Sequence, residues 1–211
     1  MSKQFSTYIF DFDGTIADTL FTVIRIINNN KEHYGIDGID ETEIPRFRNM
    51  SVRYLLKEFN IHLVQVPKFL RDIQKELGNH ISEVKCFLDM DTVMQTLKKK
   101  GAHVGIVTSN TEKNVSQFLF RHKLEKIPSF VIAEPSLFGK HKKIKKAVEK
   151  YHLNPQKTIY IGDEIRDIEA ANKAGVASGV VTWGYNGKEI LSKHHPDYLF
   201  DSPKQIVSLI E

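Results

Sequence analysis

Two aspartates that follow a short apolar run are the residues whose types and spacing most directly suggest chemistry. The run Tyr8–Phe10 is too short for a helix and predicts a buried strand that ends at Asp11. Residues i and i+2 of an extended chain point to the same side, so the carboxylates of Asp11 and Asp13 can converge on one point. Such charges repel each other unless a cation binds or one carboxyl group is protonated. An acidic turn would look similar, since Asp and Gly are ordinary turn residues.

Further polar groups follow other predicted strands. The strand His103–Thr108 is followed by Ser109 and Asn110, and the strand Thr158–Ile161 leads through Gly162 into Asp163, with Asp167 four residues later. Ligands of open α/β sheets bind at the carboxyl ends of the strands. These groups are therefore expected to cluster with the first acidic pair, although they lie far apart in the sequence.

The elements that must position these groups alternate between strands and helices from residue 84 onward. Compact apolar strands of this kind predict a parallel sheet covered by helices on both faces. Further strands are predicted at Phe130–Ala133, Gly179–Thr182 and, as an edge strand, Tyr198–Phe200. Helices are predicted at Asp91–Lys100, Thr111–Lys123, Lys140–Tyr151, Asp167–Ala174, Gly187–Lys193 and Pro203–Ile210, the last capped by Ser202.

Residues 18–83 interrupt this alternation and show only helical patterns. A helix over 18–34 is expected to stop at Gly35, Ser51 is expected to cap another, and Pro67 to open a third that ends at Gly78. The predicted fold class is therefore α/β, a Rossmann-like three-layer sandwich with a parallel sheet, plus a small all-helical cap inserted after the first strand. The expected division is a core of 1–17 and 84–211 and a cap of 18–83.

Composition limits the class of protein. The chain has 211 residues, of which 41% are hydrophobic and 27% charged, with a net charge of +4. No apolar run is long enough for a membrane span, and Met1–Thr7 lacks the apolar core of a signal peptide. A single cysteine, Cys86, excludes an internal disulfide framework and favours a cytoplasmic protein. Lysines gather at Lys98–Lys100 and Lys140–Lys146, but the sequence contains no recognised nucleic-acid-binding motif. These lysines therefore suit solvated helix faces, and the basic balance of the chain could attract a small anionic substrate.

Four segments together resemble the haloacid dehalogenase superfamily, in the phosphoglycolate-phosphatase-like branch that has a helical cap after the first strand. They are D-F-D-G-T at 11–15, the strand ending in Thr108, Lys140, and G-D-E-I-R-D at 162–167. The resemblance covers almost the whole chain. It implies a Mg²⁺-dependent phosphatase that acts on a small anionic phosphomonoester.

The resemblance also implies residue roles. Asp11 would attack phosphorus and form an aspartyl-phosphate, and Asp13 would act as general acid and base while its main-chain carbonyl contacts Mg²⁺. The true dehalogenases lack a second carboxylate at this position, so Asp13 favours phosphoryl transfer. Thr108 would hydrogen-bond the phosphoryl group. The groups expected to line the phosphate site beside it are Ser109, Asn110, Gly14 and Thr15.

A lysine and further acids complete the implied site. Lys140 would hold Asp11 and the phosphoryl group. The family lysine is commonly followed by proline, whereas His141 follows here, so Lys142 or Lys143 remains an alternative. An all-oxygen set of ligands suits Mg²⁺ and not zinc. The expected metal ligands are Asp11, Asp13, Asp163 and Asp167, the last of which could instead order a metal-bound water or serve only as an acid in a helix first turn.

Substrate choice is expected to come from the cap. At most one of Arg46, Arg48 and Arg53 is expected to contact a second anionic group of the substrate. A phosphomutase would use the same intermediate, and a receiver-type phospho-accepting regulator or a noncatalytic binding protein would belong to a different functional class. Phosphoglycolate-like substrates and sugar phosphates both fit, and either a monomer or a homodimer fits the sequence.

Overall fold

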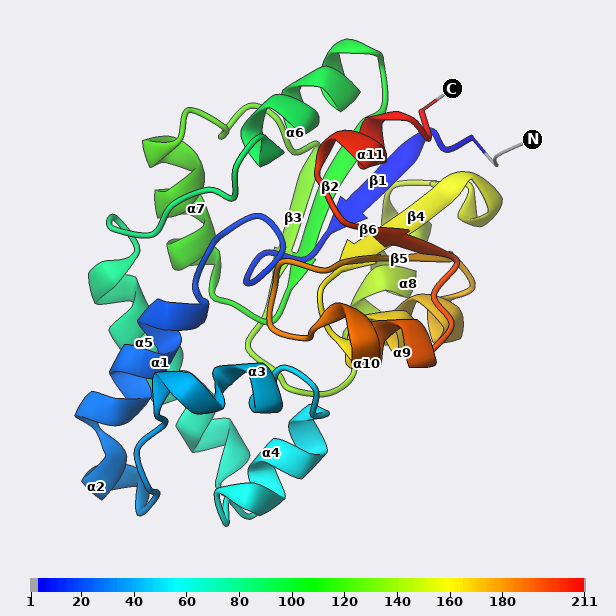
Figure 1. Ribbon diagram of the computed structural model, residues 1–211. Coiled ribbons are helices and arrows are strands. Elements are labelled where there is room, and N and C mark those ends of the chain that lie inside the picture. Colours follow the sequence, from blue (N-terminus) through cyan, green and yellow to red (C-terminus); the bar gives the residue numbers. More distant parts are fainter. Residues whose placement is uncertain (1–3, 211) are drawn as a thin grey trace.

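A single parallel sheet organises the molecule. The computed structural model describes residues 4–210 and contains six strands in the order β3-β2-β1-β4-β5-β6 (Figure 1). All neighbouring strands run parallel, and Phe10 of the first strand lies opposite Ile106 on one side and Ile161 on the other. The strands are β1 (Thr7–Phe10), β2 (His103–Thr108), β3 (Phe130–Ala133), β4 (Thr158–Gly162), β5 (Ala177–Val181) and β6 (Tyr198–Phe200).

Helices cover both faces of this sheet. Tyr8 and Phe10 belong to one apolar cluster, whereas Ile9, between them, belongs to the cluster of the opposite face, as expected for alternating side chains. The first cluster includes side chains of α6 (Met90–Lys99), α7 (Glu112–Arg121) and α11 (Lys204–Val207). The second includes α8 (Lys140–Lys150) and α9 (Ile165–Ala174), and α10 (Lys188–Lys193) packs in a smaller third cluster. The predicted three-layer α/β fold is confirmed.

An all-helical cap is inserted between β1 and α6. In Figure 1 its helices lie together beyond the arrowheads of the strands. Its two connections to the core run side by side, because Ala17 bridges Cys86 and the Asp18 amide donates to the Lys85 carbonyl at 2.9 Å. The cap consists of α1 (Leu20–Asn29), α2 (Lys31–Tyr34), a 3₁₀ turn (Glu41–Glu43), α3 (Ile44–Phe47), α4 (Val52–Glu58) and α5 (Val66–His80).

Several helix boundaries differ from the sequence expectation. The helix expected over 18–34 is broken at Asn30, whose side-chain amide donates to the Ile26 carbonyl at 2.8 Å. Helix α5 continues through Gly78 to His80. The glycine lets this helix approach α7, because a Cβ at position 78 would lie 2.7 Å from Oδ1 of Asn114. The last helix starts after Pro203, not after a Ser202 cap.

The helix N-cap expected at Ser51 is confirmed, since the Ser51 hydroxyl accepts from the Tyr54 amide at the start of α4.

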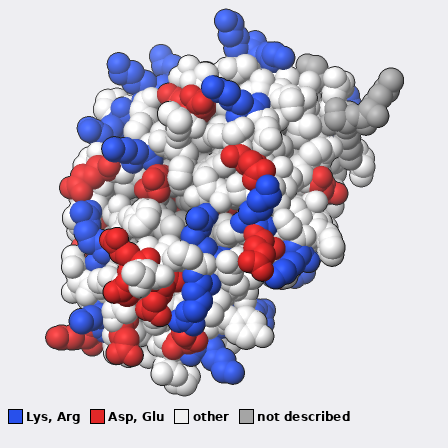
Figure 2. Space-filling model, viewed as in Figure 1, with Lys and Arg blue, Asp and Glu red and all other residues white. Residues whose placement is uncertain are grey.

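Within residues 4–210, no helix combines the length and the apolar character that a membrane crossing would need. On the face drawn in Figure 2, acidic and basic side chains are interspersed.

Candidate active site

The sheet topology brings the predicted acidic groups together. The strand order reverses between β1 and β4, which makes their carboxyl ends the switch point where α/β proteins bind ligands. Asp11 directly follows β1, and its amide donates to the Ile161 carbonyl of β4 at 2.8 Å. Asp163 directly follows β4. The two carboxylates that the sequence separates by about 150 residues are therefore neighbours.

Three buried carboxylates could hold a divalent metal ion. Asp11, Asp163 and Asp167 offer oxygens that all lie within 4.8 Å of one another. Burial, followed by the charges of Glu164 and Asp167, raises the pKa of Asp163 well above its ordinary value, as expected for a carboxyl group without a neutralising partner. Oxygen donors of this kind suit a hard cation, so the residues fit such an ion.

Asp167 is held by the start of α9. Its Oδ2 accepts from the amides of Asp163 and Glu164 at 3.1 and 3.0 Å, an arrangement that satisfies main-chain donors at the helix N-terminus. Its other oxygen, Oδ1, accepts from Lys140 Nζ at 2.6 Å. Asp167 is therefore an acid in the first turn of a helix, the alternative that the sequence left open, and the same carboxylate also belongs to the acidic cluster.

Lys140 bridges the acidic groups of β1 and α9. Its ammonium contacts Asp11 Oδ2 at 2.5 Å and Asp167 Oδ1 at 2.6 Å, and its side chain is 5% exposed. Burial alone would lower the pKa of Lys140, but the two carboxylates outweigh burial and raise it above its ordinary value. The lysine is thus a fixed positive charge beside Asp11.

The neighbouring lysines lie elsewhere. Lys143 is also buried, but its ammonium donates to the main-chain carbonyls of Glu134 and Thr108, the latter at 3.4 Å. Burial lowers the pKa of Lys143 to about 8. Lys142 is exposed. Of the three lysines considered from the sequence, Lys140 is the one that contacts Asp11.

Asp13 is oriented by an asparagine at the end of β2. The side-chain amide of Asn110 donates to both oxygens of Asp13, at 2.9 and 3.1 Å. The carbonyl oxygen of this amide accepts from the Thr111 amide at 2.7 Å and from Asn114 Nδ2 at 2.9 Å, so its donor side is turned toward Asp13. Burial and the charge of Asp11 raise the pKa of Asp13 to about 7, although the bond from Asn110 opposes this rise.

The groups expected to line the phosphate have partners that the sequence did not reveal. Thr108 Oγ1 accepts from the Asn110 amide at 3.1 Å. Ser109 Oγ is buried and has no hydrogen-bond partner within the described chain, while the Ser109 carbonyl accepts from the side chain of Gln74 on α5. Helix α5 of the cap therefore contacts the loop that follows β2.

Gly14 and Thr15 support Asp163. Gly14 has a φ of +73°, and a Cβ there would lie 2.1 Å from Asp163 Oδ2, so only glycine allows this approach. Thr15 Oγ1 donates to Asp163 Oδ1 at 2.9 Å. Both residues thus hold the carboxylate of the second acidic loop, a contact that the sequence motif did not predict.

Several residues of this site were not predicted from the sequence. The Tyr185 amide donates to Asp163 Oδ2 at 2.7 Å, and the Tyr185 hydroxyl lies 3.1 Å from that of Thr19. Tyr185 follows β5, so the rule for strand ends could have found it. Gln74 and Asn114 lie within helices, where no spacing in the sequence distinguished them.

The three cap arginines differ. Arg46 binds Glu43 and Glu58 on the cap surface, and the Arg53 guanidinium lies 5.5 Å from the centre of the Phe138 ring. Arg48 reaches the core, donating from Nη2 to the Thr182 carbonyl at 2.8 Å, and its Nε is buried without a hydrogen-bond partner in the described part of the chain. Within the described chain, Arg48 is thus the one of the three that hydrogen-bonds a core residue.

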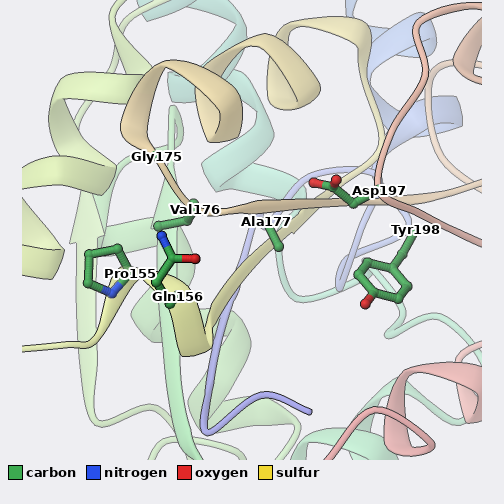
Figure 3. Close-up of a pocket in the computed structure, with 7 residues that line it drawn as sticks. All are labelled: Pro155, Gln156, Gly175, Val176, Ala177, Asp197 and Tyr198. Atoms are coloured by element: carbon green, nitrogen blue, oxygen red, sulfur yellow. The ribbon is translucent and has the colours of Figure 1, made fainter. Parts of the chain in front are cut away.

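Another pocket lies at the opposite edge of the sheet. Figure 3 shows that Pro155, Val176 and Tyr198, among others, line it near the amino ends of β4, β5 and β6. Its single carboxylate, that of Asp197, accepts from the amide and hydroxyl of Ser178 at 2.8 and 2.9 Å. The candidate catalytic groups are absent from its lining, so the acidic cluster at the carboxyl ends remains the candidate active site.

Comparisons with known proteins place this arrangement in a class of hydrolases. The family model described as haloacid dehalogenase-like hydrolase matches residues 8–181. A phosphoglycolate phosphatase of Synechococcus elongatus is 31% identical over 202 residues, which are 96% of this chain and 95% of that protein. A pyrophosphatase of Bacillus mycoides is 24% identical over 213 residues, covering 98% of this chain and 97% of that one.

A solved structure agrees in fold. A haloacid dehalogenase-like hydrolase from Streptococcus pneumoniae has a TM-score of 0.80 and 18% identity, with 97% of each chain covered. The α/β fold of this chain is shared with that hydrolase over almost its whole length. The chain belongs to the haloacid dehalogenase-like hydrolase family, in its phosphoglycolate-phosphatase-like branch. It is an enzyme of the phosphatase type.

Proposed function

We propose that this enzyme is a Mg²⁺-dependent phosphatase that hydrolyses a small phosphomonoester through an aspartyl-phosphate on Asp11. The observation that carries the proposal is the bridge from Lys140 to Asp11 and Asp167 beside Asp163, with Asp13 next to it. One set of groups thereby supplies a nucleophile, a fixed positive charge and a proton donor. These are the elements that phosphoryl transfer by a carboxylate needs.

In the first half-reaction, a carboxylate oxygen of Asp11 attacks phosphorus, and the bond between phosphorus and the leaving oxygen breaks. Lys140 holds Asp11 and offsets negative charge on the phosphoryl oxygens. Asp13 gives its proton to the leaving oxygen, and a pKa of about 7 leaves both the protonated and the ionised carboxyl group populated at neutral pH. Asn110 holds this carboxyl group in position.

In the second half-reaction, Asp13 takes a proton from a water molecule that attacks the phosphorus of the intermediate and releases phosphate and free Asp11. The residues that would hold Mg²⁺ are Asp11, Asp163, Asp167 and the main-chain carbonyl of Asp13. The ion would screen the repulsion between the Asp11 carboxylate and the phosphate dianion. Thr108, Ser109 and Asn110 would line the phosphoryl site together with Gly14 and Thr15.

The proposed organisation follows from the same fold. Residues 1–17 and 84–211 form the catalytic core and 18–83 a cap domain that excludes water from the site.

The names of the relatives support a small phosphorylated anion as substrate, and we extend this to phosphoglycolate-like molecules or sugar phosphates. The protein acts in the cytoplasm as a monomer or homodimer, without nucleic acid or membrane as partner.

Release of inorganic phosphate from a panel of phosphomonoesters, with Mg²⁺ and with chelator, tests the proposal. We expect release that requires Mg²⁺ and restoration when Mg²⁺ is returned in excess of the chelator. Release that persists unchanged after chelation would contradict the metal requirement. Phosphate that moves to a second sugar hydroxyl, without net release, would instead identify a phosphomutase.

A further inference from the structure

An asparagine of the core holds the cap at the loop that follows β5. Asn186 is 5% exposed, and its side-chain nitrogen donates to two main-chain carbonyls of the cap, those of Arg48 at 3.1 Å and Met50 at 2.9 Å. The amide of the next residue, Gly187, donates to the same Arg48 carbonyl at 2.8 Å. In Figure 1 this contact lies where the end of α3 faces the start of α10. The loop after β5 is therefore bonded to the turn that follows α3.

The guanidinium group of Arg48 adds to the same contact. Its Nη2 donates at 2.8 Å to the carbonyl of Thr182, the residue that directly follows β5. Arg48 thus contacts the core through both its main chain and its side chain.

The other half of the Asn186 side chain belongs to the acidic loop. Its Oδ1 accepts from the Ile165 amide at 3.0 Å, and the main-chain amide of Asn186 donates to the Asp163 carbonyl at 3.2 Å. Ile165 is the first residue of α9, so its amide has no acceptor within the helix. One buried side chain therefore joins the cap to the loop that carries Asp163.

Asn186 keeps these bonds only while the cap is docked. Its side-chain amide has two N–H donors, and both are used by carbonyls of the cap. If the turn at 48–50 moved away from the core, the two donors and the Gly187 amide would lose their acceptors together. A buried donor that loses its partner is costly, so these bonds favour the docked position.

We infer that Asn186 is a positioning residue that holds the cap docked on the core and couples this docking to the acidic loop. Coupling of this kind is reciprocal, so an enzyme whose cap is released should bind its substrate less tightly. This consequence for the substrate rests on the proposed phosphatase function, whereas the contact between cap and acidic loop does not. A residue that served only to cap α9 would leave the docking of the cap unchanged when its donors are removed.

Hydrogen exchange of two main-chain amides, followed by NMR on the whole protein, tests the coupling. The Ile165 amide reports the bond to the acidic loop, and the Gly187 amide reports the contact with the cap. Asn186→Asp keeps a side-chain oxygen for Ile165 but removes both donors to the cap. Relative to an unstructured peptide of the same sequence, we expect Gly187 to exchange about tenfold faster or more than in the wild type, and Ile165 to stay slow. Wild-type exchange at Gly187 in folded Asn186→Asp would overturn the inference.

A matched variant and an internal reference control this experiment. Asn172→Asp makes the same substitution at an exposed position of α9 and should leave both amides as in the wild type. The Leu191 amide, which donates to the Gly187 carbonyl at 3.2 Å, should exchange at one rate in all variants, because α10 stays intact. If circular dichroism shows that Asn186→Asp does not fold, Asn186→Ala replaces it. Faster exchange at both Ile165 and Gly187 then supports the inference, and faster exchange at Ile165 alone overturns it.

Steady-state kinetics test the consequence for the substrate. With the phosphomonoester that the wild type hydrolyses fastest, Asn186→Asp should raise KM about tenfold and change kcat by less than about threefold, because substrate binding must then also dock the cap. A wild-type KM in a variant whose Gly187 amide has lost its protection would overturn the link between docking and substrate binding. If the wild type hydrolyses no ester, the proposed function fails, and the exchange rates still decide whether Asn186 holds the cap.

Discussion

The core and the cap place their polar side chains in different ways. In the core, Asp11, Lys140 and Asp163 are at most 5% exposed and are held by bonds from several elements. In the cap, the buried polar side chains are Thr19 and Gln74, and both contact the core, through Tyr185 and Ser109. The core thus supplies the acidic cluster and its lysine, whereas the few buried polar side chains of the cap contact the core. Substitutions should therefore have large effects on turnover in the core and graded effects at the contact between the two.

The largest expected effect is at Asp11. Asp11→Asn keeps the size of the side chain but removes the anionic nucleophile, so kcat should fall by about 10⁴-fold or more while the fold is retained. Phosphate release measures kcat, and circular dichroism shows whether the fold is retained. Asp40→Asn, at an exposed acid of the cap, is the control and should retain activity. Substantial turnover by folded Asp11→Asn would show that another group is the nucleophile.

A pair of lysine variants gives the next largest effect. Lys140→Ala should lower kcat by about 10²- to 10³-fold, because Asp11 and the phosphoryl group lose their fixed positive charge. Lys143→Ala should have a much smaller effect on kcat, since this ammonium contacts main-chain carbonyls. Steady-state kinetics of both variants compare the two buried lysines directly. A larger loss of kcat in Lys143→Ala than in Lys140→Ala would reassign the catalytic lysine.

Asn114 offers a test at the boundary between core and cap. Its Nδ2 donates to Asn110 Oδ1 and to the Gln74 carbonyl of α5, both at 2.9 Å. Asn114→Ala should lower kcat about tenfold with little change in KM, because Asn110 loses one of the bonds that turn its amide toward Asp13. Asn172→Ala, on the exposed side of α9, is the matched control.

Gly78→Ala tests the same contact from the cap. Alanine favours a helix, but its Cβ would lie 2.7 Å from Asn114 Oδ1 and must displace that side chain. We therefore expect lower kcat, and we expect the double variant Gly78→Ala/Asn114→Ala to be no worse than Asn114→Ala alone. If the double variant shows the full sum of the two single losses in kcat, Gly78 and Asn114 act separately.

The smallest expected effect is a pH dependence of stability from Lys143. Burial lowers the pKa of this lysine to about 8, so above that pH the folded protein releases a proton that the unfolded chain keeps up to its ordinary pKa of 10.5. Where the unfolded chain binds more protons, stability rises with pH. Between about pH 8 and about pH 10, the Tm of the wild type should rise relative to that of Lys143→Met. Lys142→Met, at an exposed site, should follow the wild type throughout.

The sequence was sufficient for the parts of the site that follow from strand order. Asp11 and Asp163 were expected to meet because each ends an apolar strand, and the parallel sheet brings them together. The sequence favours Lys140 over Lys143, because Lys140 follows Gly139 and opens a helix, but both lie on the buried side of that helix and only side-chain placement distinguishes their partners. Gly78 was read as a helix end, since a glycine that permits close packing leaves the same local signal as one that stops a helix.

The position of β1 has a consequence for how the protein is made. This strand lies in the middle of the sheet, yet its partners are His103–Thr108 on one side and Thr158–Gly162 on the other. On the ribosome, β1 emerges first, and it must wait for about 95 residues before one edge can pair and for about 150 before both can. The nascent chain thus carries Asp11 beside an incompletely paired strand until β4 has been made, and the acidic cluster forms only when the second half of the core has emerged.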